Sequence, residues 1–77
     1  MNEIALIDSI LRGLDVNLST NKLQRELYNA LVLRLGRDKA GYLGDGGSNF
    51  TYYHINGKKL HIIRDYTRKR WHVDTGA

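Results

Sequence analysis

The sequence contains no cysteine and no proline, and its 77 residues include no long apolar run. Without cysteine the chain has neither a disulfide nor a thiolate metal site. No stretch reaches the roughly 18 apolar residues of a membrane-spanning helix, and no basic, apolar leader opens the chain. We therefore expect a cytoplasmic protein of one small domain, residues 1–77, with no cofactor and no membrane association.

A domain of this length buries only a small core. Such a core supplies about 3–5 kcal/mol of net stability, and disulfides are excluded as an additional source. Self-association is one of the remaining ways to stabilise a small domain. We expect a homodimer formed through a helix or an edge strand.

Basic residues outnumber acidic residues, twelve against eight, and the excess is unevenly distributed. Segment 58–77 carries six cations against two carboxylates, and segment 19–39 carries five against two, whereas segments 1–18 and 40–57 are net acidic. Clustered positive charge attracts polyanions, of which nucleic acid is the commonest. A soluble domain with a slight basic excess would have the same composition, so charge alone does not decide between them.

Two amphipathic segments near the N-terminus predict helices over about 3–13 and 20–35. Asn2 is a suitable N-cap for the first helix. Ser19 is the expected N-cap of the second helix, and Gly36 is its expected stop.

The segment GYLGDGGSN, residues 41–49, has four glycines in nine positions and predicts a flexible loop. In a phosphate-binding loop, glycines are followed by Gly-Lys-Ser or Gly-Lys-Thr and then by a helix. Neither feature follows here, so we expect a joint between the helices and a sheet.

The remaining sequence predicts three strands over about 50–55, 58–66 and 69–74. Asn56-Gly57 lies between the first two strands and is the strongest short hairpin signal, since both central residues of such a turn take positive φ. The predicted fold class is α+β. Two N-terminal helices pack on one face of a three-stranded antiparallel meander, in the order ααβββ.

The two-residue turn determines which side chains share a face, because successive residues of a strand point to opposite sides. The apolar set, expected beneath the helices, is Thr51, Tyr53, Ile55, Leu60, Ile62, Trp71 and Val73. The opposite set is Phe50, Tyr52, His54, Lys59, His61, Ile63, Asp65, Arg70, His72 and Asp74. Arg64 is expected beside Trp71, with its guanidinium over the indole ring.

The second set combines flat rings with cations, as proteins that bind single-stranded nucleic acid do. Tyr52 and His61 would stack on bases, and cations of segment 58–72 would contact phosphates. The predicted nucleic-acid-binding residues are Tyr52, His54, Lys58, Lys59, His61, Arg68, Lys69, Arg70 and His72. The simpler interpretation is an ordinary polar sheet face, since scattered surface aromatics need no function.

Two other binding modes remain open. A helix-turn-helix with a basic wing would use Lys22, Arg25 and Asn29, although the link between the two predicted helices is longer than the usual turn. A metal site would need His54, His61 and His72 to converge, but three histidines on strands are a weak metal signal.

A metal-independent ribonuclease is a further alternative. One of His54, His61 and His72 would take the 2′-hydroxyl proton, and another would protonate the leaving oxygen. The stretches LRLG, GGSNF and NGKKLHII resemble the glycine-serine-histidine strand and following hairpin of HicA-type toxin ribonucleases. The family's catalytic histidine would correspond to Asn49, which cannot act as a base, and its C-terminal helix has no counterpart here.

A host protein is the alternative partner. Small basic domains free of cysteine and proline are typical of phage and mobile-element products that bind and inhibit a host factor. Exposed Tyr, Trp and Arg side chains are enriched at protein interfaces as well.

Overall fold

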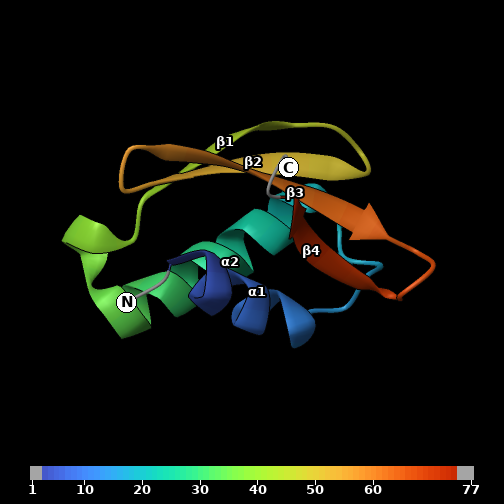
Figure 1. Ribbon diagram of the computed structural model, residues 1–77, viewed down its shortest axis with the longest axis horizontal. Helices are drawn as coiled ribbons and strands as arrows, with labels where there is room; N and C mark the ends of the chain where they lie inside the picture. The colour runs from blue at the N-terminus through green and yellow to red at the C-terminus, as the bar shows by residue number, and fades with distance from the viewer. Residues whose placement is uncertain (1–2, 75–77) are drawn as a thin grey trace.

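The computed structural model describes residues 3–74, in which two helices pack on one face of a four-stranded antiparallel sheet (Figure 1). In chain order the elements are α1 (Glu3–Arg12), α2 (Thr20–Leu35), a short 3-10 helix η1 (Arg37–Lys39), β1 (Tyr42–Gly46), β2 (Phe50–Ile55), β3 (Lys58–Asp65) and β4 (Arg70–Asp74). Each strand pairs with the next, so the sheet is a meander in the order β1-β2-β3-β4. The predicted α+β class is confirmed, but the sheet has four strands rather than three.

The ends of α2 follow from local sequence. Ser19 has an extended backbone, and its hydroxyl accepts a hydrogen bond from the Lys22 amide, as an N-cap should. Gly36 follows the last turn at φ 86°, a conformation that favours glycine. Asn2, the expected cap of α1, lies outside the described residues. Among residues 3–74, neither helix is long and apolar enough to cross a membrane.

The prediction of a loop over 41–49 is wrong, because residues 42–46 pair with β2 as an additional strand. The glycines of this segment made it resemble a loop in the sequence. A Cβ on Gly44 would lie 2.9 Å from His54 Nε2 and 3.0 Å from the Tyr52 Cβ, so the His54 ring and the Tyr52 side chain occupy the space of a side chain. A bulge between Leu43 and Gly46 also interrupts the expected alternation.

The predicted registers are confirmed. Asn56 and Gly57 both have positive φ, and the turn pairs Tyr52 with His61 across β2 and β3. The second hairpin pairs Arg64 with Trp71 across β3 and β4, as the turn near Thr67 predicts. The sheet therefore has the expected two faces.

The inner face of the sheet packs against both helices and forms the core. Its buried side chains are Thr51, Tyr53, Ile55, Leu60, Ile62 and Trp71, and the helices contribute Ile7, Leu11, Leu23, Leu27 and Leu31. Val73, also predicted here, is half-buried against this cluster. The expected contact of Arg64 with Trp71 is confirmed, since the guanidinium carbon lies 4.4 Å from the ring centroid.

Candidate nucleic-acid interface

The outer face of the sheet carries two stacked pairs of rings, each formed across adjacent strands. Tyr42 of β1 lies parallel to His54 of β2, with ring centroids 4.7 Å apart and planes 7° apart. Tyr52 of β2 lies against His61 of β3, at 4.8 Å and 20°. Both pairs follow from register, because the partners stand directly opposite each other.

Phe50 and Lys59 extend the Tyr52–His61 pair. The Phe50 ring meets both rings edge-on, with centroids 5.9 Å from Tyr52 and 5.4 Å from His61. The Lys59 ammonium lies 4.3 Å from the centroid of the Tyr52 ring. The outer face thus carries two groups of rings, Tyr42–His54 and Phe50–Tyr52–His61, and the second group has the Lys59 ammonium beside it.

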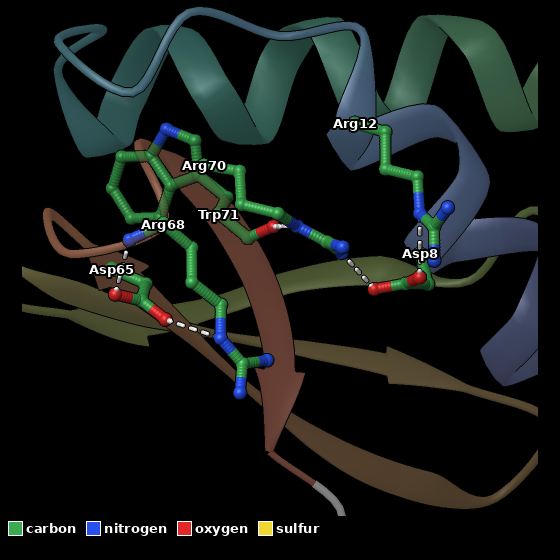
Figure 2. A network of polar contacts seen from close by, with 6 residues as sticks. All are labelled: Asp8, Arg12, Asp65, Arg68, Arg70 and Trp71. Atoms are coloured by element: carbon green, nitrogen blue, oxygen red, sulfur yellow. Dashed lines mark hydrogen bonds and ion pairs between the residues drawn. The ribbon is translucent and has the colours of Figure 1, made fainter.

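Arg70 was expected to contact phosphate, but its side chain turns from the outer face toward α1 (Figure 2). Its guanidinium contacts the Asp8 carboxylate, and its Nε donates to the Trp71 carbonyl at 3.0 Å. Arg12 contacts the same carboxylate at 3.2 Å. Arg70 therefore joins the edge of the sheet to α1 and has little freedom to bind a ligand.

The other predicted phosphate contacts lie at two separate turns. Lys58 and Lys59 are exposed at the tip of the β2–β3 hairpin, while Arg68 and Lys69 are exposed at the β3–β4 turn. The Arg68 side chain is 71% exposed and contacts Asp65 at 3.8 Å, within the same turn (Figure 2). Since hairpin turns lie at opposite ends of the shared strand β3, the structure divides these cations into two groups.

The three histidines are distributed over β2, β3 and β4 and face the outer side in successive cross-strand rows. The Nδ1 of His61 lies 3.7 Å from Asp74, and its Nε2 is buried without a hydrogen-bond partner among the described residues. His61 is thus poorly placed to exchange protons with RNA. Within residues 3–74, no three His, Cys, Asp or Glu side chains lie close enough to hold a metal ion together.

A cleft of about 810 Å³ lies beside the hairpin tip. The tip and η1 are at the same end of the molecule in Figure 1, and the cleft separates them. Cations and carboxylates share its lining, together with the stacked pair of the outer face. The lining residues that matter here are Glu3, Asp38, Lys39, Tyr42, His54, Lys58 and Lys59.

Sequence reasoning missed Tyr42 and Lys39. Tyr42 lies in the segment predicted as a loop, and Lys39 lies beyond the end of α2, so neither was assigned to a face of the sheet. Residues 42–46 show no alternation of apolar and polar side chains, so the sequence offered no period-two signal for β1. Lys22, Arg25 and Asn29, considered for a helix-turn-helix, are exposed on α2.

No protein family model matches the chain, and neither a curated protein nor a solved structure does. The resemblance to HicA-type toxin ribonucleases is therefore without support from a family match.

Proposed function

We propose that the chain binds single-stranded nucleic acid on the outer face of its sheet, without catalysis. The observation that carries this proposal is the pair of ring stacks, Tyr42–His54 and Tyr52–His61, on the face that the helices leave uncovered. Stacking on aromatic rings retains unpaired bases whatever their sequence, because every base has a flat π-face.

The cations of the hairpin complete such a surface. Lys59 lies over Tyr52 on this face, and Lys58 is exposed next to it at the hairpin tip, where it is paired with Ile55 of the inner face. Phosphates that follow the stacked bases would meet the Lys59 ammonium on this face and the Lys58 ammonium where the nucleic acid passes the hairpin tip. Paired bases are not available for stacking, so this face favours single strands over duplexes.

Salt dependence tests the proposal directly. Binding of a fluorescent mixed-sequence oligonucleotide, followed by anisotropy, is expected to weaken steeply as salt rises, since each neutralised phosphate releases counterions. Replacing Lys58 and Lys59 together by alanine should lower the slope of log K against log salt by about 1.4. Replacing Lys22 and Arg25 on α2 removes the same charge elsewhere and should leave the slope nearly unchanged.

The rings have a separate test. Tyr52→Ala is expected to cost about 1–3 kcal/mol of binding free energy, the usual contribution of one base–aromatic stack. Tyr66→Ala is the matched control, because Tyr66 is 59% exposed and lies toward Arg64 rather than the outer face. Absence of binding at low salt would contradict the proposal and favour a protein partner instead.

A further inference from the structure

We propose that the cleft beside the hairpin tip binds the phosphorylated end of a single-stranded nucleic acid. This inference rests on the nucleic-acid interface proposed above. The cleft and the outer face share Tyr42, His54 and Lys59. A strand bound across the rings therefore reaches the cleft without leaving the protein surface.

The charges of the cleft favour a terminal phosphate over an internal one. Lys58 and Lys59 line it from the hairpin, and Lys39 lines it from η1 on the other side. A terminal phosphate carries about 1.5–2 negative charges at neutral pH, whereas a phosphodiester carries one. Lys39 and Lys58, with Lys59 at the border between the cleft and the Tyr52 ring, compensate the larger charge better than a single contact does.

The acidic residues of the same cleft disfavour a backbone that continues through it. Glu3 and Asp38 lie in the lining, and the Glu3 carboxylate accepts a hydrogen bond from Asn56 at 3.1 Å. These carboxylates would repel the next phosphate of an uninterrupted strand. They remain suitable acceptors for the hydroxyl or amino groups of a terminal nucleotide.

Tyr42 supplies a place for the terminal base. The ring is 63% exposed, although His54 is stacked against one of its faces. Because β1 is the first strand of the sheet, the side of Tyr42 away from β2 has no neighbouring strand. A terminal base stacked there would extend the Tyr42–His54 pair and direct its phosphate toward the lysines.

The experiment compares four single strands of one sequence at a fixed salt concentration. They are a 5′-phosphorylated, a 3′-phosphorylated and an unphosphorylated linear strand, and a circular strand. We expect one phosphorylated end to bind about tenfold more tightly than the unphosphorylated and circular strands, as an additional charge-assisted contact would produce. The two phosphorylated strands reveal which end the cleft accepts.

A substitution of Lys39 tests the cleft independently of the outer face, because Lys39 lines the cleft but does not belong to the sheet. Lys39→Ala and Lys39→Gln should remove the preference for the phosphorylated end and leave binding of the circular strand within about twofold of its original value. Lys22→Ala, an equal loss of charge on α2, should retain the preference. Equal affinity for circular and phosphorylated strands would overturn this inference alone, whereas failure to bind any strand would overturn the proposed interface with it.

Discussion

Arg68 and Arg70 are separated by one residue but have different partners. Arg68 pairs with Asp65 inside its own turn and remains mostly exposed. Arg70 reaches Asp8, 62 positions away in the sequence, in a half-buried contact. The charge pattern of the sequence cannot distinguish the two arginines, because only the packing of α1 against β4 brings Asp8 to the sheet.

Arg70→Ala is expected to lower the free energy of unfolding by about 1–2 kcal/mol, since it removes a charge-assisted contact that joins α1 to β4. Arg68→Ala should change stability by less than about 0.5 kcal/mol, as expected for an exposed pair. Urea denaturation measures both. If the loss in Arg70→Ala comes from Asp8, the double variant with Asp8→Ala should be less destabilised than the sum of the single variants.

The pKa of the Tyr53 hydroxyl differs between the folded and the unfolded chain. Its ring is fully buried, and its hydroxyl donates to the Ala40 carbonyl. Burial, with Tyr28 nearby, raises the pKa of Tyr53 from 10.0 to about 12. The folded state therefore retains the phenolic proton at a pH where the unfolded chain loses it.

The consequence is a loss of stability at high pH. The contribution of Tyr53 to the free energy of unfolding is fully present below about pH 10. It declines by up to about 2–3 kcal/mol as the pH rises toward about 12. Unfolding free energies measured between pH 9 and about 12 should show this decline. Tyr53→Phe should flatten the curve in that interval, whereas Tyr42→Phe, which changes an exposed ring, should leave it steep.

Among the secondary-structure elements, β1 depends most on glycine. Gly41 precedes it at φ 76°, and a Cβ there would lie 2.2 Å from the His54 carbonyl oxygen of β2. The chain thus turns from η1 into the sheet at a point where the neighbouring backbone excludes any side chain. This requirement explains why glycine stands at the position immediately before β1.

Gly41→Ala and Gly57→Ala distinguish two reasons for glycine at these positions, a positive φ and a lack of space for a Cβ. Both positions have φ near 75°, but nothing lies within 4 Å of a Cβ at Gly57. Gly57→Ala should therefore cost only the backbone strain of about 1–2 kcal/mol. Gly41→Ala should cost at least about 2 kcal/mol more, because the collision with β2 adds to the strain. Similar unfolding free energies for the two variants would show that β1 tolerates displacement.

At the scale of the whole molecule, we predict a homodimer, which a measurement of the native mass tests. Leu33 is 86% exposed on α2, and a helix is one of the two contacts that we expect to mediate self-association. Leu33→Lys should convert the dimer to a monomer, as seen by sedimentation equilibrium. A mass of 8.8 kDa for the unaltered chain at every concentration would contradict dimerisation. A dimer that survives Leu33→Lys would assign the contact to an edge strand.

Much of this architecture could be predicted because its determinants are local. The Asn56-Gly57 turn sets the register of β2 and β3, and period-two alternation then separates Tyr53 and Leu60 from Tyr52 and His61. Hydrophobic spacing and capping residues define α2 in the same way. The sequence by itself thus determined the helices, the β2–β3 and β3–β4 hairpins, and which residues of these three strands share a face, apart from Arg70.

Three features were decided by the tertiary structure alone, since each depends on groups far apart in the chain. The strand β1 forms with glycine at Gly44 and Gly46 because His54 and Thr51 of β2 occupy the space of a side chain there, although glycine ordinarily disfavours strands. Arg70 leaves the outer face because α1 places a carboxylate beside β4. The cleft exists because η1 and the hairpin tip lie on either side of it at the same end of the molecule, and short-range patterns contain no information about that placement.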